Sequence, residues 1–87
     1  MLAEMIGQKV VIDLRSPYVC LGTLHRWDDH FLEVLHADLH DLRDTATNRE
    51  SYVVEARRTG IKRNRQRVLI VRADVVAISL WKDVNLD

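Results

Sequence analysis

The sequence predicts a mainly β protein, a small and strongly bent five-stranded antiparallel barrel with a helix at its N-terminus. Three observations lead to this fold class. The 87 residues suffice for a single hydrophobic core. Five short segments have strand character and are separated by turn residues. Gly22 interrupts the longest of these segments, where it allows a sharp bend or a close backbone approach, as small barrels need. We expect one domain over residues 1–82 and a C-terminal tail over residues 83–87.

The chain begins with a short helix and a strand. Apolar residues within 2–6 are spaced as on one face of a helix, and Gly7 is a natural stop after it. Residues 10–14 then alternate between two faces, as the residues of a strand do. The turn at residues 15–17 contains the only proline of the chain.

A second and a third strand form the middle of the chain. The second strand covers about residues 18–27, and the third follows the corner at residues 28–30. At this corner we expect the neighbouring acids Asp28 and Asp29 to cap the turn through hydrogen bonds from the backbone. Apolar and polar residues alternate over 35–40, which predicts one apolar face and one wet face for the third strand.

An insert at residues 44–60 breaks the strand pattern. Thr47 and Glu50 have the spacing of a helix capping box. The segment ends in cations and a glycine, which suit the C-terminus of a helix. We therefore expect a short helix over residues 48–59. Strand is the alternative, because the residues at 52–54 are also good strand formers.

Two further strands close the chain. A basic loop at residues 61–66 leads into a strand at 68–71, and a turn at 72–74 separates it from the last strand at 75–81. A barrel this short leaves its outermost strands open, and an open edge can pair with another copy of the chain.

Positive charge is concentrated in one stretch of the chain. The formal net charge is zero, yet residues 57–67 contain six cations and no acid. The six are Arg57, Arg58, Lys62, Arg63, Arg65 and Arg67. Their guanidinium and ammonium groups could contact the phosphates of a nucleic acid. The structural interpretation has equal weight: a solvated helix end and loop, or pairing across subunits with the acidic stretch 28–44.

Histidines and an aspartate gather on the predicted wet face of the third strand. The set is His36, Asp38 and His40, with His25 and His30 elsewhere in the chain. Imidazole and carboxylate groups suit zinc. However, residues two apart in one strand project in parallel rather than toward one ion. We therefore expect a solvated or inter-subunit polar face and no metal.

The remaining candidates have simple structural interpretations. Trp27 and Trp81 are expected to fill a core or an interface, and Cys20 to be a small buried apolar residue. The sequence contains no glycine-rich phosphate loop and no Ser/His/Asp grouping with identifiable roles. We expect neither an enzyme nor a bound cofactor.

Two short motifs match a known pattern by their spacing. The first has a glycine in mid-strand, a leucine two residues later and an aspartate six residues after the glycine. Here these are Gly22, Leu24 and Asp28, followed by His30 and Phe31 at the aromatic and apolar positions of the motif. The second motif begins at Val71-Arg72-Ala73, with alanine in place of glycine, and ends at Ile78.

Together with the order of helix and strands, these motifs resemble the Sm-like family. This family of ring-forming small barrels includes archaeal and eukaryotic Sm proteins and a bacterial RNA chaperone. The resemblance covers about residues 1–43 and 67–81. It suggests a divergent bacterial or phage-type member in which the loop between the third and fourth strands, residues 44–66, is enlarged.

The resemblance implies a ring that binds single-stranded RNA, as an RNA chaperone or an RNA-processing scaffold. In the family, a base stacks on the aromatic residue of the first motif, and the arginine of the second packs on its other side. By position these residues are His30 and Arg72, with Asp28 at the same pore. Stacking of this kind suits single-stranded RNA. Leu32 stands where the family often has asparagine, so the base-edge hydrogen bond of that asparagine is missing.

The alternative is a structural or protein-assembly ring that binds no RNA. In both cases we expect a cyclic homo-oligomer in which the fourth strand of one copy pairs with the fifth strand of the next. The size of the ring and any preferred RNA sequence stay open.

The chain shows no signal for export or for a membrane. Its first seven residues include an acid and lack both a basic leader and a long apolar run. No stretch approaches the roughly 18 apolar residues of a membrane span. We therefore expect a cytoplasmic protein that does not interact with a membrane.

Overall fold

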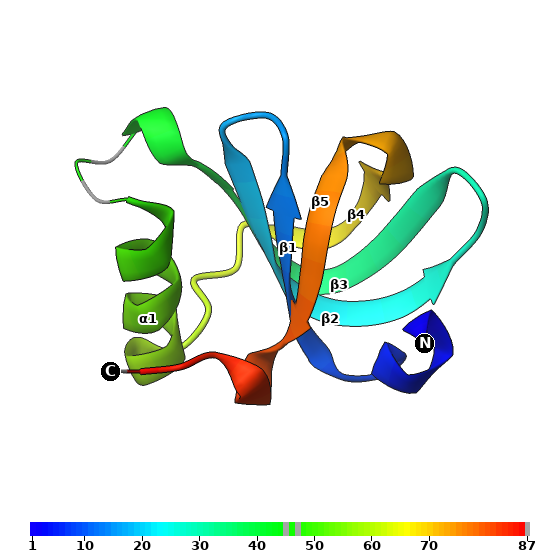
Figure 1. The fold of residues 1–87 in the computed structure, drawn as a ribbon, viewed down its shortest axis with the longest axis horizontal. Coiled ribbons are helices and arrows are strands. Elements are labelled where there is room, and N and C mark those ends of the chain that lie inside the picture. The colour runs from blue at the N-terminus through cyan, green and yellow to red at the C-terminus, as the bar shows by residue number, and fades with distance from the viewer. Residues whose placement is uncertain (45, 47, 87) are drawn as a thin grey trace.

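The structure, a computed structural model, describes residues 1–44, 46 and 48–86. Within these residues, five antiparallel strands form one strongly bent sheet, and one α-helix lies beside it (Figure 1). The elements are β1 (Lys9–Leu14), β2 (Tyr18–Trp27), β3 (Phe31–Asp41), α1 (Arg49–Thr59), β4 (Arg65–Val71) and β5 (Val75–Leu80). The strand order is β4-β3-β2-β1-β5, so β4 and β5 lie at the two ends of the sheet. The predicted bent, five-stranded fold is confirmed.

The N-terminal helix is a single 3-10 turn, Leu2–Met5. Gly7 follows it with a φ of 81°, a conformation that glycine adopts without strain. The Gly7 N–H donates to the carbonyl oxygen of Leu24 at 2.7 Å. This bond attaches the N-terminal turn to β2.

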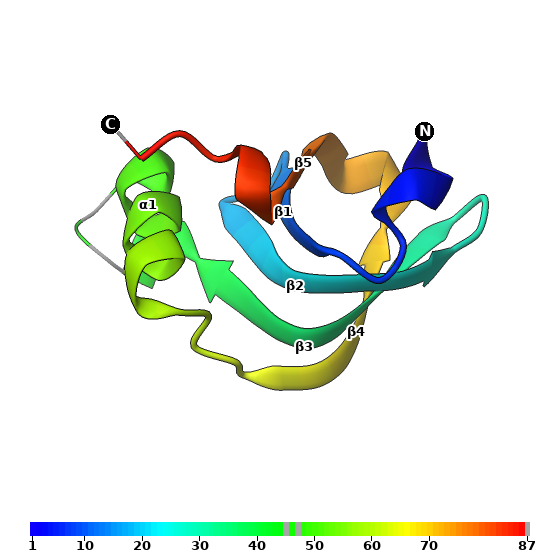
Figure 2. The same ribbon diagram turned by 90° about the horizontal axis from the view of Figure 1, so that it is seen from below.

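β2 and β3 are strongly curved, as Figure 2 shows. Gly22 lies in the middle of β2. A Cβ atom at this position would lie 2.6 Å from Val34 Cγ1 and 2.9 Å from the carbonyl oxygen of Leu35. The register between β2 and β3 also shifts between Leu21 and Thr23, and such a bulge bends a strand. The close backbone approach predicted for this glycine is therefore confirmed.

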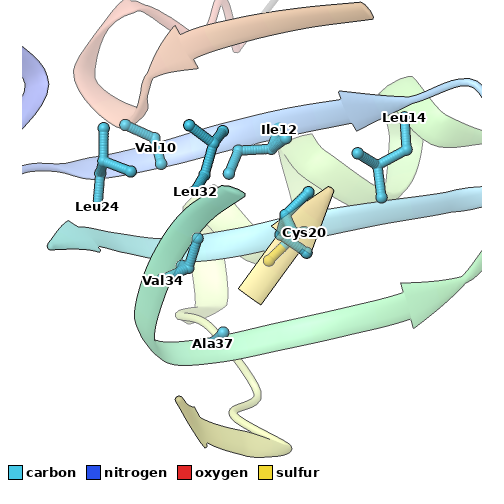
Figure 3. Packing of buried hydrophobic residues seen from close by; sticks show 9 residues of the cluster. Val10, Ile12, Leu14, Cys20, Leu24, Leu32, Val34 and Ala37 are labelled. Atoms are coloured by element: carbon cyan, nitrogen blue, oxygen red, sulfur yellow. The ribbon is translucent and has the colours of Figure 1, made fainter. Parts of the chain in front are cut away.

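The hydrophobic core lies inside this bend (Figure 3). Its buried members are Val10, Ile12, Leu14, Cys20, Leu24, Leu32, Val34, Ala37 and Ile70. Cys20 is fully buried, as predicted. Burial raises the pKa of its thiol to about 12, because the thiolate would lose its hydration.

Helix α1 packs against the other face of the sheet. Val53 and Ala56 of the helix meet Val11, Val19 and Leu21 in a second buried cluster. Among the helices within residues 1–44, 46 and 48–86, none is long and apolar enough to cross a membrane.

The wet face predicted for the third strand is wrong at Asp38 and His40, whereas His36 is exposed as predicted. Asp38 is buried, and its carboxylate accepts hydrogen bonds from the Tyr52 hydroxyl and from Asn64 Nδ2. The ring of His40 stacks on the ring of Tyr52, with centroids 3.9 Å apart and planes 6° from parallel. This face of β3 is dry at these positions because α1 and the loop after it cover it.

The insert contains a helix rather than a strand, as expected. Asn48 is its N-cap, and the side chain of Asn48 accepts a hydrogen bond from the Ser51 N–H at 2.8 Å. The predicted cap at Thr47 falls on a residue outside those that the structure describes. At the other end, Gly60 has a φ of 99° and ends the helix as predicted.

Three strand boundaries differ from the prediction. β1 begins at Lys9, one residue earlier than expected. β4 begins at Arg65 rather than at residue 68, because Arg65 and Arg67 pair with Ala37 and Leu35 of β3. The predicted basic loop is therefore shorter by two residues. β5 ends at Leu80, and a 3-10 turn begins at Trp81.

Candidate nucleic-acid interface

The turn between β2 and β3 is held by Asp28. Its Oδ1 accepts hydrogen bonds from the N–H groups of His30 and Phe31, both at 2.8 Å. The bond from His30 and then that from Phe31 lower the pKa of Asp28, since they stabilise the carboxylate. The predicted turn-capping role of this aspartate is confirmed. The arrangement fixes the backbone of His30 and leaves this residue exposed at the tip of the turn.

Arg72 reaches the same turn from the end of β4. Its N–H donates to the carbonyl oxygen of His30 at 2.8 Å, and its Nη1 donates to that of Asp28 at 2.6 Å. The three residues predicted to line a pore are therefore neighbours, although Arg72 is separated from Asp28 by 44 positions. The geometry offers an exposed imidazole beside a guanidinium group that the backbone holds in place.

Trp27 also belongs to this cluster, which the sequence did not predict. Its side chain is 41% exposed and therefore lies outside the core. The guanidinium carbon of Arg72 lies 5.5 Å from the centroid of its ring, within cation–π range. Trp27 is thus a third contact of Arg72 at this turn, besides the carbonyl oxygens of Asp28 and His30.

Leu32 does not take part in this surface. Its side chain is buried in the core, while the neighbouring Phe31 points to the opposite face and is 40% exposed. This is the expected alternation of a strand. Position 32 therefore offers no polar group to a ligand at the turn.

The six cations of residues 57–67 divide into groups with different surroundings. Arg57 Nε donates to the carbonyl oxygen of Trp81 at 2.8 Å, and Arg58 Nη2 donates to that of Leu86 at 3.0 Å. These two arginines attach the C-terminal segment to α1. Their guanidinium groups are thus already engaged on one side with carbonyl oxygens of the chain itself.

The other cations lie along the loop after α1 and on β4. Arg63, Arg65 and Arg67 line an open hollow together with His36, whose φ of 51° lies in the left-handed region. Arg63 and Lys62 are exposed. Positive charge is therefore dense at the start of β4, whereas Arg72 follows its other end.

Glu33 is the centre of an ion-pair cluster that the sequence did not predict. The residue is 3% exposed, and its carboxylate contacts His25 Nδ1, Arg67 Nε and Arg26 Nε. The bond with His25, and after it that with Arg67, lowers the pKa of Glu33 to about 2. The one feature of the sequence that could have indicated this cluster is an acidic residue placed among apolar residues of a strand.

The histidines considered as metal ligands have unlike surroundings. His25 contacts Glu33, His40 stacks on Tyr52, and His30 lies at the exposed turn. In the part of the chain that the structure describes, no three His, Cys, Asp or Glu side chains are grouped to hold a metal ion.

Comparisons with known proteins identify the fold. No family model matches the sequence, and no curated protein matches it. Among solved structures, the chain is similar to a heptameric archaeal Sm protein, with a TM-score of 0.61 and 21% sequence identity. The similarity covers 91% of this chain and 93% of the Sm protein. The chain therefore has the Sm-like fold that its two motifs predicted.

Proposed function

We propose that this Sm-like chain assembles into a cyclic homo-oligomer and binds single-stranded RNA at the central hole. The observation that carries the proposal is the meeting of Asp28, His30 and Arg72 at one turn. The archaeal Sm protein of the same fold is heptameric. Residues 1–82 would be the assembling unit, with an RNA-chaperone or RNA-scaffold role.

Assembly is supported by the free edges of the sheet. In the described residues, β4 and β5 each pair with only one neighbouring strand. Leu69 and Val71 of β4 are exposed, and Val76 of β5 is 64% exposed. Unpaired backbone groups beside exposed apolar side chains are a template for pairing with another chain. Pairing β4 of one copy with β5 of the next is a head-to-tail contact, and such contacts form a ring when the rotation between successive copies adds up to a full turn.

RNA binding is supported by the chemistry of the turn. A base can stack on the exposed imidazole of His30, and the fixed guanidinium group of Arg72 can cover the other side of the base. The cations Lys62, Arg63 and Arg65 would add contacts to phosphates, as would Arg57, Arg58 and Arg67 through their free donors. Such contacts make affinity fall as salt rises.

The test is fluorescence anisotropy of labelled U-rich and A-rich oligonucleotides across a salt series. We expect the double variant His30→Ala/Arg72→Ala to lose affinity by about 10- to 100-fold, since stacking contributes about 1–3 kcal/mol per base. Its oligomer mass should stay that of the wild type. Arg15→Ala, an exposed arginine of the β1–β2 turn, is the matched control and should bind as the wild type does.

The alternative function is a ring that binds only protein. It is favoured by Leu32, because its buried, apolar side chain cannot form a hydrogen bond with the edge of a base. If the assembled wild-type protein binds neither oligonucleotide at low salt, this alternative replaces RNA binding.

A further inference from the structure

A second hollow lies on the sheet face that points away from the core. Its volume is about 430 Å³, and β2, β3 and β4 contribute to its walls. Leu32 and Ile70 point into the core, so their neighbours Phe31, Glu33 and Leu69 point into this hollow instead. The proposed function involves Asp28, Arg67 and Leu69 of its walls singly, but assigns no ligand to the hollow itself.

Two guanidinium groups are held at this hollow by a buried acid. Arg26 Nε lies 2.9 Å from Glu33 Oε1, and Arg67 Nε contacts Glu33 Oε2. The side chains of Arg26 and Arg67 nevertheless remain 71% and 55% exposed. Without His25, the charged side chains that line the hollow, Arg26, Arg67, Glu33 and Asp28, sum to zero. The two guanidinium groups therefore contribute to binding as exposed, fixed hydrogen-bond donors rather than through a net positive charge. Guanidinium groups fixed in this way are good donors to phosphate.

The other walls of the hollow are apolar or aromatic. Trp27, Phe31 and Leu69 all line it, and all three are exposed. Exposed aromatic rings beside cations suit a ligand that combines a planar base with an anionic group. Asp28 also lines the hollow, but its Oδ1 is occupied by the N–H groups of its own turn.

We infer that this hollow is a nucleotide-binding site. The base would lie against Trp27 and Phe31, and the phosphate would accept hydrogen bonds from Arg26 and Arg67. The site requires neither a ring nor His30, so it goes beyond the pore proposed above. A free nucleotide and one nucleotide of an RNA strand share this chemistry.

The experiment uses Trp27 as the reporter of binding. In a Trp81→Phe background it is the only tryptophan, and its fluorescence is titrated with AMP, UMP, the two nucleosides and inorganic phosphate. Calorimetry on the wild type supplies a readout without the Trp81 change. We expect AMP and UMP to quench the fluorescence and to bind at least ten times tighter than the nucleosides or phosphate.

Variants then separate the hollow from the pore. Arg26→Gln should weaken AMP binding about tenfold, while Glu33 keeps His25 and Arg67 as partners and the fold is retained. His30→Ala and the control Arg63→Gln should leave AMP binding unchanged. Loss of RNA binding in His30→Ala alone, with AMP binding intact, would show that the two sites are independent.

Titration with a trinucleotide then distinguishes a free nucleotide from one nucleotide of an RNA strand as the natural ligand. Tighter binding of the trinucleotide than of AMP, sensitive to Arg26→Gln, assigns the hollow to an RNA strand, and the reverse order assigns it to a free nucleotide. The inference is overturned if millimolar AMP and UMP leave Trp27 unquenched. It is also overturned if Arg26→Gln binds AMP as the wild type does.

Discussion

At Gly22 the backbones of β2 and β3 approach so closely that no side chain fits between them. A glycine in mid-strand is a local signal, and the sequence could therefore predict its role. The role of Glu33 could not be predicted in the same way. Its partners Arg26 and Arg67 come from two other strands, and the register that brings them together is a property of the folded sheet.

Replacing Gly22 by alanine should destabilise the fold. The new Cβ would meet the backbone oxygen of Leu35 as well as Val34, and overpacking of this kind costs about 1–3 kcal/mol. Urea denaturation would measure the free energy of unfolding. Thr23→Ala, the next position of β2, removes atoms rather than adding them and should cost less. A Gly22→Ala variant as stable as the wild type would contradict the close approach.

At the level of elements, the sequence predicted that α1 is a helix but not which surface of the sheet it covers. Its cations and final glycine predicted the helix, and its start is set by Asn48. The surface that it covers was not predictable, since alternation along β3 does not tell whether another element covers its polar side. Tyr52 and Asn64 supply the partners that let Asp38 be buried there.

The cap of α1 is testable by itself. Asn48→Ala removes the acceptor for the Ser51 N–H and should lower the free energy of unfolding by about 1 kcal/mol. Asn48→Ser keeps an acceptor and should stay close to the wild type. Thermal unfolding followed by circular dichroism would compare the three proteins. Equal losses in both variants would mean that the hydrogen bond does not stabilise the helix.

In the whole molecule, the two outermost strands belong to opposite ends of one sheet. The sequence predicted five strands and open edges, and the strand order confirms that β4 and β5 are not partners within the chain. The turn cluster was predictable in part, because the two motifs indicated His30 and Arg72. Trp27 beside them was not, since its exposure follows from how the strands end.

Assembly should be sensitive to a charge placed on a free edge. Light scattering at micromolar concentration should give the wild type a multiple of 10.1 kDa. Val76→Glu should give a folded monomer, because pairing would bury the new carboxylate without a partner. The control Ile6→Glu, also at an exposed apolar residue but in the segment before β1 rather than on an edge strand, should keep the wild-type mass. A monomeric wild type would refute the ring.

The burial of Cys20 has a practical consequence for chemical labelling. This residue is the only cysteine of the chain, it is fully enclosed, and its pKa of about 12 keeps the thiol protonated at neutral pH. Alkylating reagents act on accessible thiolates. A cysteine introduced on the surface would therefore be the sole target of a maleimide dye or crosslinker, and the native thiol need not be removed first.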